Sequence, residues 1–138
     1  DIRARYVSEV FHAPSDDAHA HSEFSHNAGR RAVEMLAENP QITAFVCPID
    51  MAAAGTLVSL KRAGIRVPDD VSIIGFHNDP WTEFLEVPLT TMAEPTEPKC
   101  ELCREILQSR LQGDNGPWRR EITRYRLVER ASTAAPSH

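Results

Sequence analysis

Five residues with side chains suited to ligand binding lie next to predicted strands and helices. They are Phe24 before a predicted helix, Ile49 and Asp50 after one apolar run, and His77 and Asn78 after a second. In open α/β sheets, ligands bind outside the carboxyl ends of the parallel strands. An aromatic face with a few hydrogen-bonding groups suits a small polar molecule such as a sugar or a base. We therefore predict that these five residues contact a small-molecule ligand.

Some of these residues also have a purely structural interpretation. The side chain of Asp50 is well placed to cap a helix predicted at 51–62. Phe24 suits a hydrophobic core as well as it suits a ligand site. A core role explains His77 less well, because polar side chains follow it directly in the sequence. For His77, ligand binding is therefore a better interpretation than a structural role.

Histidine and cysteine spacing offers two alternatives to this chemistry. Four histidines near the N-terminus could hold a metal, but a closed site needs fixed geometry, and a solvated loop explains them more simply. These histidines are His12, His19, His21 and His26. Cys100 and Cys103 have the spacing of metal or redox ligands, but no second pair accompanies them and a mid-helix position favours ordinary thiols. We predict no metal site and no cofactor.

Motifs that identify enzymes are missing from the sequence. It contains no glycine-rich phosphate loop, no Gly-x-Ser-x-Gly and no His-Glu-x-x-His. Acidic residues and histidines occur, but none has a spacing that is diagnostic of catalysis. We therefore predict no catalytic residue and no enzyme activity.

The composition is that of an ordinary globular domain without a nucleic-acid-binding surface. The 138 residues carry a formal net charge of -5, and scattered basic residues do not favour contacts with phosphates. No apolar run approaches the roughly 20 residues of a membrane helix, and the first residues lack a signal-peptide pattern. Three cysteines without a disulfide spacing favour a reducing compartment. We therefore expect a cytoplasmic protein with no membrane partner.

Apolar periodicity predicts alternating strands and helices. The sequence predicts a strand at 6–11, a polar loop at 12–22, a helix at 25–38, a strand at 42–47, a helix at 51–62, a strand at 71–74, a helical turn at 81–85, an extended segment at 88–92, a helix at 99–112 and an edge strand at 121–128. Gly64 should end the second helix, and Gly75 should turn the chain after the third strand. The tail from Ala131 should be frayed. This order predicts an α/β fold with three layers, a parallel sheet and flanking helices.

Two predicted helices have unusual apolar surfaces. The helix at 51–62 is apolar or small on nearly every side, whereas a helix covering one face of a sheet normally has a polar side. This excess predicts the interface of a symmetric homodimer, and a half-exposed helix of small residues is the alternative. The predicted interface residues are Met51, Ala54, Leu57 and Val58. The residues expected to face inward from the helix at 99–112 are Cys103, Ile106, Leu107 and Leu111.

Three segments together resemble a known protein family. They are 42–55, with the sequence ITAFVCPIDMAAAG, 64–76, with GIRVPDDVSIIGF, and 88–91, with PLTT. The set resembles the effector-binding domain of the lactose/galactose-repressor family of bacterial transcription regulators. The sequence RAST at 130–133 resembles the closing segment of that family. The resemblance extends from about residue 22 to residue 133.

The resemblance implies a periplasmic binding protein-like fold, with two subdomains around an effector cleft. It implies that residues 1–138 form the C-terminal part of an effector-binding and dimerisation domain, and that the DNA-binding domain is missing from this chain. The crossover segment and helix at 93–113 belong to the first subdomain in full-length relatives. Without that subdomain, the helix at 99–112 should extend freely, repack, or swap onto a neighbouring chain of a homodimer.

The resemblance also implies a function. The chain would sense a sugar-like or related effector and control DNA binding through the missing domain, and a periplasmic solute-binding protein of a sugar transport system is the alternative. Phe24 matches an aromatic residue that stacks on the effector in some members. Ile49 replaces a polar residue, so one hydrogen bond is lost, and His77 replaces an aspartate that usually binds the effector. These departures make an anionic or phosphorylated effector an alternative to a sugar or purine.

Overall fold

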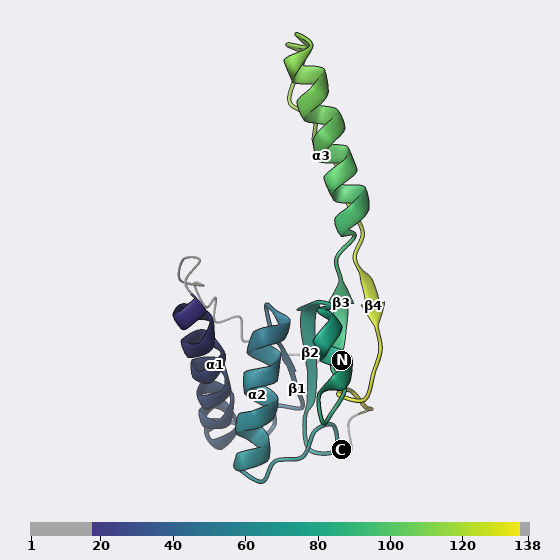
Figure 1. Cartoon of the computed structure of the whole chain (residues 1–138). Coiled ribbons are helices and arrows are strands. Elements are labelled where there is room, and N and C mark those ends of the chain that lie inside the picture. Colours follow the sequence, from purple (N-terminus) through teal and green to yellow (C-terminus); the bar gives the residue numbers. More distant parts are fainter. Residues whose placement is uncertain (1–17, 136–138) are drawn as a thin grey trace.

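The computed structural model describes residues 18–135, with side chains from residue 25 onward, and the strand predicted at 6–11 lies outside this part. Its elements are α1 (Ala18–Glu38), β1 (Ala44–Val46), α2 (Asp50–Arg62), β2 (Ser72–His77), the 3-10 helix η1 (Pro80–Phe84), β3 (Thr90–Ala93), α3 (Thr96–Leu111) and β4 (Arg126–Val128). Figure 1 shows α1 and α2 side by side next to the sheet, while α3 extends far away from them.

The four strands form one sheet in the order β1-β2-β3-β4. β1, β2 and β3 run parallel, and Phe76 of β2 pairs with Met92 of β3. β4 lies at the edge, antiparallel to β3, with Leu127 opposite Met92. The predicted α/β fold is therefore confirmed. Its first three strands are parallel as predicted, whereas the edge strand β4 is antiparallel. The edge strand is confirmed only at Arg126–Val128, because 121–125 do not pair.

The hydrophobic core lies between α2 and the sheet. Ala52, Ala53 and Leu60 of α2 are fully buried, and they pack with Ile73 of β2 and Leu89 next to β3. Burial of these side chains supplies the main favourable free energy of folding. The core therefore holds α2 in a fixed position above the strands.

A second helix covers α2 from the side. α1 packs against α2 through small residues, because a Cβ atom on Gly55 would overlap Ser25 and a Cβ atom on Gly29 would overlap Ser59. The Ser25 hydroxyl also donates a hydrogen bond to the carbonyl oxygen of Met51, at 2.8 Å. Such close backbone approach needs glycine. Part of the small and apolar character of α2 is therefore explained by α1 within the same chain.

α1 begins earlier than the sequence analysis predicted. The loop predicted at 12–22 overlaps the helix from Ala18, so that prediction is wrong over 18–22. No glycine or proline follows Pro14 until Gly29, so nothing in the sequence interrupts the helix there. The polar, histidine-rich composition indicates a solvated helical surface as readily as a loop.

The end of α2 agrees with the prediction at Gly64. This glycine has a φ of 76°, and its N–H donates to the carbonyl oxygen of Lys61 at 3.0 Å. The N–H of Ile65 donates to the carbonyl oxygen of Leu60, also at 3.0 Å. These two bonds form a Schellman motif, which satisfies the last carbonyl groups of the helix.

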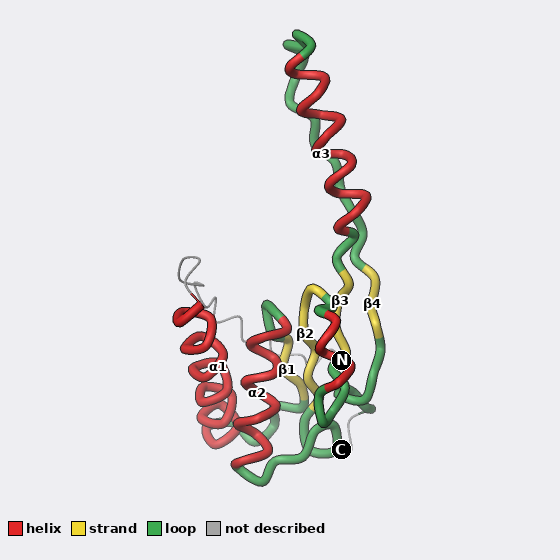
Figure 2. The backbone as a smooth tube through the Cα atoms, in the orientation of Figure 1, coloured by secondary structure: helices red, strands yellow, loops and turns green. Residues whose placement is uncertain are grey.

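α3 does not bury the residues that were expected to face inward. Cys103 is exposed, and Leu107 and Leu111 are 61% and 80% exposed. Figure 2 shows α3 and the returning chain extending beyond the sheet. The helix also begins at Thr96 rather than 99, because Pro98 is tolerated in the first turn, where a missing N–H costs no helical hydrogen bond. Within this single chain α3 extends from the sheet, and its exchange with a neighbouring chain stays a prediction.

The segment after β4 is ordered in the core, so the prediction of a frayed tail from Ala131 is wrong for Ser132. The Ser132 hydroxyl is fully buried. It donates to the carbonyl oxygen of Ile73 at 2.6 Å and accepts from the N–H of Thr90 at 2.8 Å. The backbone of Ser132 accepts from the N–H of Ile73 as well, at 2.8 Å. A small polar residue here completes the hydrogen bonding between β2 and β3.

Among the helices of residues 18–135, none combines the length and the apolar character that crossing a bilayer requires.

Replacing Ser132 with Ala should destabilise the chain by roughly 2–4 kcal/mol, because one N–H and one C=O would lose a buried partner. Urea unfolding followed by circular dichroism measures the change. Ser109→Ala is the matched control, since the Ser109 hydroxyl bonds to Asp114 on the exposed α3 segment. Equal unfolding midpoints for the two variants would contradict the role assigned to Ser132.

Candidate functional site

The carboxyl ends of the parallel strands β1, β2 and β3 lie together, and the end of the sheet where they lie is called the strand-end edge below. Because β1, β2 and β3 are parallel, the segments that follow Val46, His77 and Ala93 leave the sheet on the same side, and His77 lies opposite Ala93 in the register. Ligands bind at this edge in open α/β folds. The structure therefore brings Ile49 and Asp50 to the same edge as His77.

Asp50 connects these strand ends below the surface. Its side chain is fully buried. Oδ2 accepts a hydrogen bond from the N–H of Asp79 at 2.8 Å, and Oδ1 accepts from the hydroxyl of Thr91 at 2.6 Å. The Thr91 hydroxyl oxygen accepts in turn from the N–H of Asn78, at 3.3 Å. The predicted capping role is wrong, because Ile49 occupies the N-cap position and no side chain caps α2.

Gly75 makes room for the Asp50 carboxylate. A Cβ atom at position 75 would overlap Asp50 Oδ1 and would lie 2.8 Å from Leu89 Cδ2. Gly75 therefore lies inside β2, and its predicted role as the turn after the strand is wrong. The sequence pattern was misleading because a glycine within a strand can indicate close approach of another group rather than a turn.

The turn is made by His77 and Asn78. Their φ angles are 107° and 61°, so both residues have left-handed backbone conformations although neither is glycine. The side-chain oxygen of Asn78 accepts a hydrogen bond from Arg130 at 2.8 Å, and Arg130 also donates to the carbonyl oxygen of Leu89 at 2.7 Å. Strained residues of this kind persist where the surroundings hold them. This arrangement leaves the side chain of His77 exposed at the edge.

The structure describes the side chain of one of the two remaining predicted ligand residues, Ile49, but not that of the other, Phe24. Ile49 is half-buried and packs on the core beside the strand end. The backbone of Phe24 belongs to α1, and its side chain lies outside the described part. Ligand contact by Phe24, Ile49, Asp50, His77 and Asn78 stays a prediction.

Sequence reasoning missed a cluster of three residues, of which Glu94 lies near His77. The Glu94 carboxylate accepts from the hydroxyl of Tyr125 at 3.2 Å and pairs with Lys99. The hydrogen bond from Lys99 is the largest cause that lowers the pKa of Glu94, and the bond from Tyr125 and the nearby His77 lower it further. Only the pairing of β3 with β4 brings Tyr125 next to Glu94, so no local pattern could have identified the cluster.

The sequence offered two alternative metal sites, one at four histidines and one at Cys100 and Cys103. Among the side chains that the structure describes, those of residues 25–135, no group of three or more potential metal ligands occurs. The side chains of His12, His19 and His21 lie outside the described part, and His26 is exposed on α1. Cys100 and Cys103 are free and exposed, whereas Cys47 is buried and its pKa is raised to about 11 by burial.

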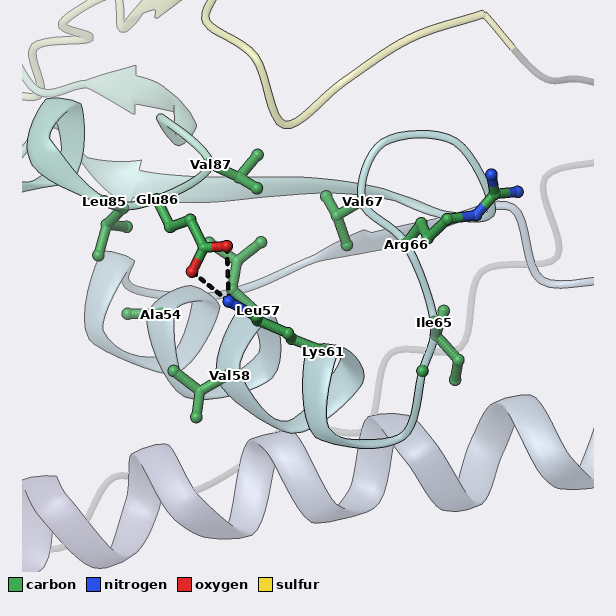
Figure 3. A pocket seen from close by; sticks show the side chains of 11 residues that line it. Ala54, Leu57, Val58, Lys61, Ile65, Arg66, Val67, Leu85, Glu86 and Val87 are labelled. Atoms are coloured by element: carbon green, nitrogen blue, oxygen red, sulfur yellow. Dashed lines mark hydrogen bonds and ion pairs between the residues drawn. The ribbon is translucent and has the colours of Figure 1, made fainter.

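A separate apolar groove lies at the other end of α2 (Figure 3). It has a volume of about 330 Å³ between the C-terminal half of α2 and the loops at 64–67 and 85–87. Lys61 lies in it and forms an ion pair with Glu86, at 2.6 Å from Nζ to Oε1. Of the four predicted interface residues, the groove is lined by Ala54, Leu57 and Val58. Met51 and Val58 are 40% and 49% exposed.

Gly75→Ala should destabilise the fold by roughly 2–3 kcal/mol, as overpacking of a tight core does, and should displace the Asp50 carboxylate. Unfolding in urea gives the free energy, and amide shifts of Asp79 report the loss of its hydrogen bond. Gly116→Ala in the exposed 114–117 turn is the control. A variant as stable as wild type with an unchanged Asp79 signal would refute this account.

Comparison with known proteins identifies the family. Residues 3–133 match the family model described as periplasmic binding protein-like domain. The chain is 38% identical over 120 residues to the HTH-type transcriptional repressor CytR of Escherichia coli K12, which covers 84% of this chain and 34% of that protein. The chain therefore spans about a third of the length of this relative.

Two further comparisons agree with this result. The lactose operon repressor of Rhizobium radiobacter is 31% identical over 109 residues, covering 78% of this chain and 95% of that sequence. The crystal structure of a LacI family transcriptional regulator from Arthrobacter sp. FB24 in complex with lactose superimposes with a TM-score of 0.70 at 33% identity, covering 80% of this chain and 41% of the other. The chain belongs to the periplasmic binding protein-like domain family, within the effector-binding domains of the lactose/galactose-repressor (LacI/GalR) type.

Proposed function

We propose that the chain is the ligand-sensing and dimerisation portion of a bacterial transcription regulator. The observation that carries the proposal is the arrangement at the strand-end edge. Asp50, which follows β1, accepts hydrogen bonds from the turn after β2 and from β3, and His77 is exposed beside it. The relatives named above are transcriptional repressors or regulators. Their identity supports a regulator over a periplasmic solute-binding protein and gives no support for an enzyme.

In this proposal, the predicted ligand residues have different roles. His77 and Ile49 face the effector, and Phe24 stacks on it. Asp50 and Asn78 hold the backbone of the turn, since their side-chain oxygens already accept protein hydrogen bonds. A rigid turn fixes the imidazole of His77 before the effector arrives, which lowers the entropy cost of binding.

The proposed mechanism is a shift between two arrangements of subdomains. The segment at 93–113 belongs to the first subdomain of full-length relatives, and the effector binds between that subdomain and the rest of this chain. An effector that binds one arrangement more tightly increases the population of that arrangement. The change then alters the separation of DNA-binding domains that lie outside this chain. Such a regulator operates in the cytoplasm, which agrees with the free thiols.

The proposed effector is a small metabolite with hydroxyl groups, because the structure of the Arthrobacter relative contains lactose. Ile49 supplies no hydrogen bond at the site, and His77 can donate or accept one. A phosphorylated or otherwise anionic sugar is the second candidate, because a protonated imidazole attracts an anion.

A ligand screen tests the proposed site. We expect one class of compound, among neutral sugars such as lactose and their phosphate esters, to shift the amide signals of Ile49 and His77 in nuclear magnetic resonance spectra. His77→Ala should weaken that binding by roughly tenfold, equivalent to one hydrogen bond of about 1.4 kcal/mol. The control is His26→Ala, at an exposed position on α1.

The outcome also separates the two effector classes. If phosphate esters bind the wild-type chain and His77→Asp abolishes that binding, the effector is anionic. If neutral sugars bind His77→Asp as tightly as the wild-type chain, the anionic candidate is refuted. If a bound compound shifts signals elsewhere and His77→Ala binds it equally well, the site is not at the strand ends.

We further propose that the chain forms a homodimer through α2. Met51, Ala54, Leu57 and Val58 leave apolar surface exposed next to the groove, although α1 and the sheet already cover the other sides of the helix. Exposed apolar surface beside a groove favours protein association. A dimer that exchanges residues 99–112 is the alternative, because Leu107 and Leu111 are exposed on α3.

Two lysine substitutions distinguish these dimers. Light scattering over a dilution series should find a dimer for the wild-type chain. Val58→Lys should raise its dissociation constant by roughly tenfold or more, because a charge would be buried at the interface, while Leu111→Lys should leave it unchanged. The reverse pattern supports exchange of α3, and a monomer at every concentration refutes both dimers.

A further inference from the structure

The chain contains an arm that leaves and rejoins the sheet at one place. We define the arm as residues 94–125, which include α3, and the body as the other described residues. The arm begins directly after β3 and ends directly before β4, and Figure 1 shows it extending away from the body. No residue of α3 is fully buried. Among the described residues, the contacts that join the arm to the body lie at its base.

Three side chains meet at this base. Glu94 is the first residue of the arm and Tyr125 is the last, and the tyrosine hydroxyl donates a hydrogen bond to Glu94 Oε1 at 3.2 Å. Lys99, in the first turns of α3, forms an ion pair with the same oxygen of Glu94. One carboxylate therefore connects the outgoing chain, the returning chain and the start of the helix.

The same cluster contacts the strand that carries the candidate site. The ring of Tyr125 packs on the ring of Phe76, with centroids 5.1 Å apart and planes inclined by 50°. Phe76 lies in β2 directly before His77, and their rings make an edge contact at 6.4 Å. Aromatic pairs at these distances are attractive beyond the area they bury.

Other polar contacts within the described arm are local. Arg104 pairs with Glu101, and Arg119 pairs with Glu121. Both pairs join residues two or three positions apart, so neither can set the direction of the arm. They are useful controls, because they have the same chemistry as the pair at the base.

We propose that Glu94, Lys99 and Tyr125 form a clasp that sets the orientation of the arm on the body, and that Phe76 links this clasp to the turn at His77. A displacement of His77 would then change the packing of Phe76 on Tyr125 and release or tighten the clasp. This attachment of the arm is a property of the chain itself and does not depend on the identity of any effector.

Distances between two spin labels test the clasp in the full chain. Cys100 carries the label on the arm once Cys103→Ser removes its neighbour, and Arg62→Cys supplies an exposed position on the body. Cys47 stays unlabelled because it is buried and its pKa is raised to about 11. We expect one narrow distance distribution for this labelled parent, with a centre that reports the orientation of the arm. Intermolecular distances are removed by dilution with unlabelled chain.

Single substitutions then weaken the clasp at Tyr125 or Glu94, or remove its link through Phe76. Tyr125→Phe removes the hydroxyl, Glu94→Gln removes the charge, and Phe76→Leu removes the ring contact. Each should broaden the distance distribution roughly twofold, as expected for an element released to collective motion. Glu101→Gln, which breaks the local pair with Arg104, should leave the width unchanged.

The results separate release of the arm from loss of the fold. Circular dichroism and the unfolding midpoint should be the same for Tyr125→Phe and the parent, because the hydroxyl lies at the surface. A parent distribution as broad as that of Tyr125→Phe would overturn the proposal. So would clasp variants as narrow as Glu101→Gln. If only Phe76→Leu stays narrow, the clasp is retained and its link to His77 is refuted.

Discussion

The buried carboxylate of Asp50 is the constraint on which the candidate site depends. Burying a charge is unfavourable unless hydrogen bonds and favourable dipoles compensate for the lost hydration. Asp50 receives hydrogen bonds from Asp79 and Thr91, and it lies in the first turn of α2, where the helix dipole favours a negative charge. Gly75 is needed so that β2 can pass this carboxylate. One side chain therefore fixes α2, the turn after β2 and the strand β3 relative to each other.

The surroundings of α2 show how much of a helix that is apolar or small on nearly every side is covered within this chain. The core takes up Ala52, Ala53 and Leu60, and the glycine contacts allow α1 to approach a second side. What remains is a limited exposed face that includes Met51 and Val58 and continues into the groove. The sequence pattern alone overstated the surface that an external partner has to cover, because it could not reveal the contribution of α1.

The body and the arm are held together by different kinds of interaction. The body has a continuous buried core, and its last segment is bound between strands through Ser132. The arm exposes Leu107 and Leu111 and is joined to the body by polar and aromatic contacts at its base. Apolar burial is hard to rearrange because a packed core resists small shifts, whereas a few exposed contacts can change at low cost. This difference places any mobility of the described chain at the base of the arm, directly beside His77.

The sequence by itself determined the mostly parallel α/β architecture, the end of α2 at Gly64 and the family, because apolar periodicity, glycine and short motifs are local properties of the chain. It also placed His77 at a strand end. Only the tertiary structure decided that Asp50 binds the turn after β2 and strand β3 instead of capping its helix, that Gly75 gives space rather than a turn, and that Ser132 is buried. Each of these roles depends on a partner tens of residues away, such as Thr91 for Asp50 or Ile73 for Ser132. Such partners meet only when the sheet assembles, so no local pattern in the sequence can specify them.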